Sequence, residues 1–117
     1  MAPPTIQIFG TKKCNETRKA ERFFKERGVK VQSIDLGQKG MSEGELRSVA
    51  NGVGGMAALI DVDSKRYLDK GLKYAAPTGP RLESLLLDDP LLLRTPIVRA
   101  GKQATIGYQP DTWKAWL

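Results

Sequence analysis

One stretch decides the fold of this 117-residue chain: TIQIFGTKKCNETRKAERFFKERGVKVQSID, residues 5–35. Residues 5–9 alternate and have high β-propensity, which predicts a strand. Apolar side chains then recur at i, i+3 and i+4, as in a helix that buries one face, and Gly28 suits the position just past its end. Residues 29–35 predict a second strand. Two strands joined by one helix imply a right-handed crossover and a parallel strand pair.

The central part of the chain predicts further helices. Ser42 and Glu45 have the spacing of a capping box, which marks the start of a helix. The run at 73–80 contains Pro and Gly and is expected to interrupt regular structure. Three short helices are expected around it, at residues 56–60, 67–72 and 80–87.

The C-terminal part predicts a β-hairpin and a last helix. Residues 96–106 form two short strand patterns around a Gly-Lys turn. A helix at about 111–117 carries two tryptophans, which are expected to pack in the core. The order of these elements predicts an α/β fold, with a mixed four-stranded sheet flanked by helices. We expect one domain, residues 1–117, with a helical insertion at about 40–90.

The content of Cys and His limits the chemistry that the chain can support. It has one Cys, Cys14, and no His. One thiol forms neither an internal disulfide nor a CxxC pair nor a multi-thiolate metal site, and without imidazole there is no Ser-His-Asp or Cys-His catalysis. We therefore expect no bound metal, and a reaction that depends on a thiolate, carboxylates, cationic side chains, hydroxyls or backbone amides.

The net charge of +6 is concentrated at one end of the chain, because residues 1–30 contain eight Lys or Arg and three Glu. A basic end favours an anionic ligand or partner, although a solvated helix face explains it as well. No DNA-binding motif accompanies the charge, so nucleic acid is not an expected partner. The apolar runs are too short to cross a bilayer, and residues 1–9 lack the pattern of a secretory signal. A cytoplasmic chain without membrane contact is expected.

Cys14 is the candidate nucleophile. It lies between the first predicted strand and a helix for which Asn15 is the expected N-cap, where the helix dipole and free N–H groups stabilise an anion. Lys12, Lys13 and Arg18 add positive charge, so the pKa of the Cys14 thiol should be lowered. Arg18 lies one turn along and could reach back toward an anion that the first-turn amides bind. The alternative is that Cys14 is a small buried apolar residue.

Both ends of the chain resemble the ArsC/Spx family. Residues 8–20, with a strand, a short loop, Cys14 and then Arg18, are similar to the family's active-site segment. Residues 92–98 and 106–108 resemble its C-terminal hairpin. The resemblance covers nearly the whole chain and implies a thioredoxin-like fold enlarged by a helical segment.

The family resemblance also implies two kinds of function. The best-known members reduce arsenate with one catalytic Cys, and glutathione and glutaredoxin supply the electrons. On that basis Cys14 and Arg18 would be catalytic, glutathione would be a co-substrate and a glutaredoxin-type protein a thiol donor. Other members are transcriptional regulators that bind RNA polymerase, so an adaptor for RNA polymerase or another protein is the alternative. Regulatory members usually carry CxxC, whereas Thr17 holds the second position here.

Thr95-Pro96 matches the position of the cis-proline that faces the active-site Cys in thioredoxin-like folds. A cis bond there exposes backbone groups that can pair with a thiol substrate such as glutathione. The alternative is a trans Pro at the start of an edge strand. We therefore place Thr95, Pro96 and the neighbouring Arg94 with Lys12, Lys13 and Asn15 as candidate substrate-binding residues.

The sequence departs from the arsenate-reducing members at the three arginines that hold the oxyanion. The first position, just before the hairpin proline, is Thr95, and Arg94 comes one residue too early. The second falls near Asp-Val-Asp at 61–63, and the third near Gly-Tyr at 107–108. Arg66 and Arg94 are the candidates to replace them, although strand alternation points Arg94 away from the Thr95 side. Arsenate is therefore not the expected substrate.

Overall fold

A computed structural model describes residues 5–72 and 77–117 of the chain. The strands in this part are β1 (Ile6–Gly10), β2 (Val31–Asp35), β3 (Ile97–Ala100) and β4 (Gln103–Ile106). The helices are α1 (Asn15–Glu26), α2 (Glu43–Val53), α3 (Lys65–Asp69), α4 (Pro80–Asp88) and α5 (Pro110–Trp116). Two short 3-10 helices, η1 (Met56–Leu59) and η2 (Pro90–Leu92), belong to the insertion.

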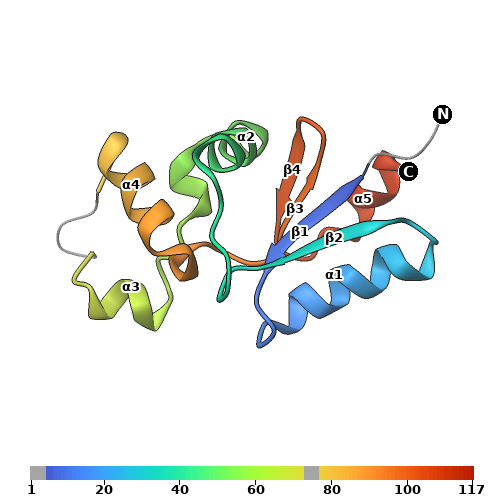
Figure 1. Ribbon diagram of the computed structural model, residues 1–117, viewed down its shortest axis with the longest axis horizontal. Coiled ribbons are helices and arrows are strands. Elements are labelled where there is room, and N and C mark those ends of the chain that lie inside the picture. Colours follow the sequence, from blue (N-terminus) through green and yellow to red (C-terminus); the bar gives the residue numbers. More distant parts are fainter. Residues whose placement is uncertain (1–4, 73–76) are drawn as a thin grey trace.

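The four strands form one mixed sheet in the order β2-β1-β3-β4. β1 runs parallel to β2, with Ile6 opposite Val31, as the crossover predicts. β1 runs antiparallel to β3, with Ile8 opposite Val98, and β3 and β4 form the predicted hairpin. The expected thioredoxin-like sheet, flanked by helices and with a helical insertion, is thus confirmed (Figure 1).

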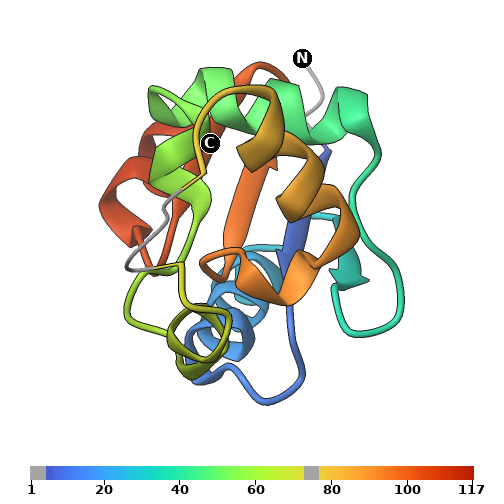
Figure 2. The same ribbon diagram turned by 90° about the vertical axis from the view of Figure 1, so that its left-hand side faces the viewer.

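The two faces of the sheet are covered by different helices. α1 lies below the strands and α2 above them in the view of Figure 2. On the α1 face, apolar residues of β1 and β3 pack against α1 and α5 in one cluster: Ile6, Ile8, Ala20, Phe23, Phe24, Val98, Ala100 and Trp113. On the other face, Phe9 and Ile97 join a larger cluster with α2 and the insertion. Successive side chains of β1 point to opposite faces of the sheet, so this strand contributes to both clusters.

Both ends of α1 follow from local chemistry, with one correction to the prediction. Cys14, not Asn15, is the N-cap: its backbone is extended and Asn15 is already helical. At the other end Gly28 has φ of 68°. Its N–H donates to the Lys25 carbonyl, and the Val29 N–H donates to the Phe24 carbonyl, which completes a Schellman cap. Because Val29 belongs to this cap, β2 begins later than expected.

The helices of the insertion also have identifiable starts. The predicted capping box is confirmed, since the Ser42 hydroxyl accepts from the Glu45 N–H and the Glu45 carboxylate accepts from the Ser42 N–H. The helix expected at 67–72 starts earlier, because the Ser64 hydroxyl accepts from the Tyr67 N–H and caps α3. The interruption expected at 73–80 falls partly outside the described residues.

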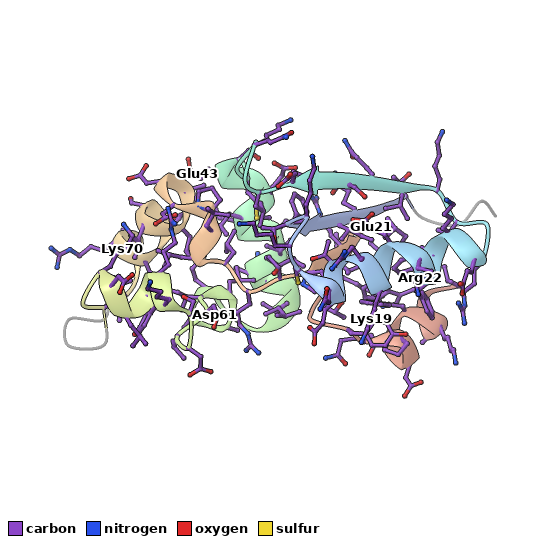
Figure 3. All side chains as sticks on the ribbon, turned by 90° about the horizontal axis from the view of Figure 1, so that it is seen from below. Lys19, Glu21, Arg22, Glu43, Asp61 and Lys70 are labelled. Carbon is purple, nitrogen blue, oxygen red and sulfur yellow. The ribbon has the colours of Figure 1, made fainter. Side chains whose placement is uncertain are left out.

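A short antiparallel bridge ties the two ends of the insertion together next to the sheet. Ile60 pairs with Leu93. The Asp61 N–H donates to the Leu92 carbonyl at 2.8 Å, and the Arg94 N–H donates to the Leu59 carbonyl at 2.7 Å. The segment around residue 61 is thereby held beside the start of the hairpin. Figure 3 shows Asp61 on the side of the insertion that faces α1.

Candidate active site

The Cys14 thiol lies between the start of α1 and the residue before the hairpin proline. The loop after β1 closes with a hydrogen bond from the Cys14 N–H to the Thr11 carbonyl at 3.2 Å. The thiol, which is partly exposed, donates to the Thr95 carbonyl oxygen at a distance of 3.8 Å. The Thr95-Pro96 bond is cis, as predicted. Residues 81 positions apart in the sequence therefore meet at the sulfur.

The pKa of the Cys14 thiol is lowered, as expected, but only one of the two expected causes, the N–H groups of the first helical turn, contributes. Burial acts to raise this pKa, because it disfavours the thiolate. The hydroxyls of Thr17 and Thr95 and the backbone N–H groups of Thr17 and Glu16 can donate to the thiolate, and their effect outweighs that of burial. Hydrogen-bond donors, rather than nearby cations, therefore account for the lowered pKa.

Thr17 is a site residue that the sequence analysis treated only as a missing second Cys. Its side chain is buried, and its hydroxyl oxygen has no hydrogen-bond partner among the residues that the structure describes. It packs closely on Gly10, where an added Cβ would overlap the Thr17 side chain. Once Cys14 loses its proton, the Thr17 hydroxyl can donate to the sulfur. The spacing of three residues on a helix is the signal that could have indicated this contact.

Replacing Thr17 by Val should slow the reaction of Cys14 with a neutral alkylating reagent several-fold at pH 7. Val has the shape of Thr but cannot donate a hydrogen bond, so the thiolate loses a partner and the pKa of Cys14 rises. Alkylation by iodoacetamide, followed by mass spectrometry across pH, measures the change. Thr17→Ser keeps the hydroxyl and should retain most of the rate. Equal rates for the two variants would contradict this role.

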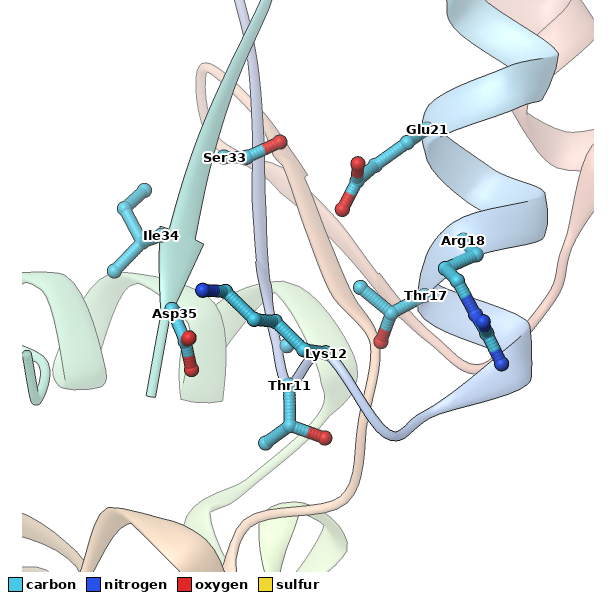
Figure 4. Close-up of a pocket in the computed structure, with 9 residues that line it drawn as sticks. Thr11, Lys12, Thr17, Arg18, Glu21, Ser33, Ile34 and Asp35 are labelled. Atoms are coloured by element: carbon cyan, nitrogen blue, oxygen red, sulfur yellow. The ribbon is translucent and has the colours of Figure 1, made fainter. Parts of the chain in front are cut away.

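Arg18 and Asn15 form a pair on the first turn of α1. The Arg18 guanidinium donates to the Asn15 side-chain oxygen, so it reaches back toward the start of the helix as expected. It lines a cavity of about 360 Å³ between α1 and β2, together with Lys12, Glu21 and Asp35 (Figure 4). Arg18 therefore lies near the thiol loop without contacting the sulfur directly.

A second cavity, of about 450 Å³, lies beside the loop that precedes Cys14, although Cys14 itself does not line it. Lys12, Lys13 and Thr95 all line it, so three predicted substrate-binding residues come together here. Asp35 and Asp61 line it as well. The sequence analysis placed residues 61–63 near an anion-holding position of the family but gave neither carboxylate a role in this site. Apolar contacts come from Leu91 and Leu93 at the end of the insertion.

The two arginines that could have replaced the missing ones do not reach this site. Arg94 is exposed and lines neither cavity; its backbone N–H is used in the bridge to Leu59. The Arg66 Nε lies 2.7 and 2.8 Å from the two carboxylate oxygens of Asp89, and Lys70 lies 3.3 Å from the same group. Burial acts to raise the pKa of Asp89, but these two cations outweigh it and lower that pKa. Arg66 is therefore held by an ion pair in the insertion.

The structure also bears on two expectations from composition, which concern metal binding and membrane-spanning helices. Among residues 5–72 and 77–117, no group of three or more Cys, Asp or Glu side chains is arranged to hold a metal ion. In the same part of the chain, no helix has the length and apolar character needed to cross a membrane.

A mixed four-stranded sheet, with a thiol at the N-terminus of the helix after the first strand and a cis-proline next to that thiol, defines a thioredoxin-like thiol protein. Comparison with known families identifies which kind. The model of the ArsC family matches residues 9–116, and the chain belongs to that family.

The relatives of the chain include regulators and structures described as arsenate reductases. It is 27% identical over 114 residues to the global transcriptional regulator Spx 2 of Oceanobacillus iheyensis, covering 97% of this chain and 84% of that protein. It is 26% identical to the uncharacterized protein YusI of Bacillus subtilis, covering 94% and 96% of the two chains. An arsenate reductase structure from Vibrio cholerae superposes with a TM-score of 0.85 at 21% identity, over 99% of this chain and all of that one. The last match is a likeness of fold.

Proposed function

We propose that this protein is a cytoplasmic, glutathione-linked thiol oxidoreductase in which Cys14 is the nucleophile. The observation that carries the proposal is the Cys14 thiol itself, which is partly exposed, lies against the carbonyl of the residue before the cis-proline and has a lowered pKa. A thiolate is the reactive form of Cys, so a lowered pKa increases its concentration at neutral pH. Family membership supports thiol chemistry on this scaffold.

The reaction is a pair of thiol–disulfide exchanges. The Cys14 thiolate attacks the glutathione sulfur of a mixed disulfide, a Cys14–glutathione disulfide forms, and the substrate sulfur leaves as a thiolate that takes a proton from water. The thiolate of a second glutathione then attacks this bond, glutathione disulfide leaves, and the Cys14 thiolate is restored. Because the chain has one Cys, the second thiol must come from outside, from glutathione or a glutaredoxin-type donor.

Within this proposal the predicted site residues have separate roles. The first-turn amides favour negative charge at the sulfur, and Arg18, held by Asn15, offers positive charge near the thiol loop to an anionic group of the substrate. The backbone around Thr95 and Pro96 supplies pairing groups for an extended thiol substrate. Arsenate is not the proposed substrate. The three arginines with which arsenate-reducing members hold the oxyanion are absent here, neither Arg66 nor Arg94 replaces them, and Asp35 and Asp61 line the cavity beside the thiol loop.

The proposal is tested by the pH dependence of Cys14. The rate of alkylation by iodoacetamide should rise with pH through a midpoint below that of a free cysteine peptide in the same buffer, because the thiolate reacts and its pKa is lowered. Incubation with glutathione disulfide should yield one glutathione adduct per chain, read by mass spectrometry. A midpoint at or above that of the peptide, with no adduct, would rule the proposal out.

A second candidate is a regulatory adaptor that binds RNA polymerase. It is favoured by the match to a regulator named Spx 2 over nearly the whole chain. Thr17 removes the CxxC pair, so such an adaptor would act without an internal disulfide switch. Binding to purified RNA polymerase that is unchanged in a Cys14→Ser variant would favour this candidate over the enzyme.

A further inference from the structure

A groove of about 500 Å³ lies between α1 and α5, and among the described residues it shares no lining side chain with the two cavities beside the thiol loop. Four cationic side chains and one carboxylate, that of Glu26, line this basic groove. The cations are Lys19 and Arg22 of α1, Arg27 at its C-terminal cap and Lys114 of α5. Figure 3 shows Lys19 on the side of α1 toward α5 and Glu21 on the side toward β2. The side of α1 that faces α5 is therefore the more positive one.

Two of these cations are held in place by contacts that leave their charge intact. The Arg27 guanidinium lies 3.8 Å from the centroid of the Phe23 ring and donates to the Phe23 carbonyl at 3.1 Å. The Lys19 ammonium lies 5.9 Å from the centroid of the Tyr108 ring. An aromatic ring attracts a cation without carrying a net charge, so both side chains are oriented and remain available to an anion.

The described carboxylates do not neutralise the basic groove. Within residues 5–72 and 77–117, the cations that form an ion pair within 4.0 Å are Arg47, Arg66 and Lys70, all of which belong to the insertion. Glu26 follows Arg22 by four positions, the spacing at which opposite charges can pair on a helix, yet these two side chains form no such pair. The net positive charge of the groove is left for an anionic partner to neutralise.

The positive surface continues along α1 toward Cys14. Asn15 and Arg18, in the first turns of the helix, line a neighbouring cavity together with Lys19 and Arg22. Because Lys19 and Arg22 also line the basic groove, the surface runs from the start of α1 to its end. A helix of 12 residues is about 18 Å long, which matches about five residues of an extended peptide.

The chemistry of the basic groove favours an acidic protein segment over a nucleic acid. The aromatic rings that line it, those of Phe23 and Tyr108, are already in contact with Arg27 and Lys19, whereas single-stranded nucleic acids stack their bases on uncovered rings. The carboxylate of Glu26 repels phosphate but can accept from the backbone N–H groups of a peptide, which a sugar-phosphate chain does not have. The guanidinium groups match the geometry of carboxylates.

We propose that the basic groove docks an extended acidic segment of a partner protein, with the carboxylates of that segment on Lys19, Arg22 and Lys114. The segment lies along α1, so the rest of the partner is brought close to the end of the helix that carries Cys14. This interaction is independent of the proposed thiol exchange, because docking requires no reaction at the sulfur.

The test uses a fluorescein-labelled peptide of about ten residues in which Glu and Ser alternate, titrated with the wild-type protein and followed by fluorescence anisotropy. Binding should saturate, weaken as the salt concentration rises, and disappear when Gln replaces Glu in the peptide. Arg22→Gln combined with Lys114→Gln should raise the Kd about 3- to 10-fold, because two of the docking charges are lost.

A matched double variant separates a docking site from a general effect of charge. Lys25→Gln combined with Lys102→Gln removes the same two charges at exposed residues that do not line the basic groove, and should change the Kd less than about 2-fold. Thermal unfolding followed by circular dichroism checks that both double variants are folded. In nuclear magnetic resonance spectra of the wild-type protein, the amide signals of residues 19–27 and 110–116 should shift as the peptide is added.

Three results would overturn the inference. They are the absence of peptide binding, an equal loss of affinity in the two double variants, and tighter binding of oligothymidine than of the peptide at the same ionic strength. The last result would assign the groove to nucleic acid. None of them concerns the reaction of Cys14 with glutathione disulfide, so the proposed thiol exchange would still stand. Conversely, a protein that binds the peptide and forms no glutathione adduct would support docking and contradict the proposed function.

Discussion

Cys14→Ser is expected to reduce thiol transfer to the uncatalysed background, a loss of roughly 10³-fold or more. The hydroxyl of Ser does not ionise near neutral pH, and the chain has no other Cys to replace the lost thiolate. A coupled assay with glutathione, glutathione reductase and NADPH, and a peptide–glutathione mixed disulfide as substrate, measures the loss. Thr17→Ser, which leaves Cys14 in place, is the matched hydroxyl control.

The stability of Cys14→Ser makes the result interpretable. Cys14 is the N-cap of α1 and its side chain makes no capping hydrogen bond. Ser is a favourable N-cap, so the variant should be as stable as the wild-type protein or more stable, by up to about 1 kcal/mol. Thermal unfolding followed by circular dichroism checks this. Transfer activity that persists in a folded Cys14→Ser variant would show that the thiol is not the nucleophile.

The parts of the fold that the sequence predicted well are those with strong local signals. The β-α-β unit of residues 5–35 could be predicted because its strand patterns, its helical spacing and Gly28 all lie within one continuous segment. The Ser42 capping box and the hairpin at 96–106 are equally local. The cis bond before Pro96 came from the family resemblance, since a local pattern does not distinguish the two isomers.

The parts of the site that the sequence did not predict depend on contacts between distant residues. Asp61 reaches the cavity beside the thiol loop because Ile60 pairs with Leu93, a contact that no spacing rule indicates. Arg66 was a candidate for anion binding, but Asp89, 23 positions away, pairs with it. The spacing from Cys14 could have indicated the contact of Thr17, but its burial required tertiary information, because it depends on the close approach to Gly10.

The core beneath α1 explains how the thiol loop is held, and Trp113 is its largest fully buried side chain. Its ring lies 5.3 Å from that of Phe23 and 5.2 Å from that of Phe24, measured between centroids. Its indole N–H donates to the Thr105 hydroxyl at 2.7 Å. Through these contacts α5 joins α1, which carries Cys14 at its start, to the sheet edge at β4.

Trp113→Ala is expected to lower the free energy of unfolding by about 3–5 kcal/mol, because it opens a cavity among aromatic rings and leaves the Thr105 hydroxyl without its donor. Unfolding in urea, with the slope compared between variants, measures the loss. Trp116→Ala is the matched control on the same helix. Trp116 is only partly buried, so its removal should cost about 1 kcal/mol or less. Equal losses for the two variants would mean that the overall apolar area of α5 holds it in place. The packing of Trp113 would then not be what joins α5 to α1, the helix that carries Cys14.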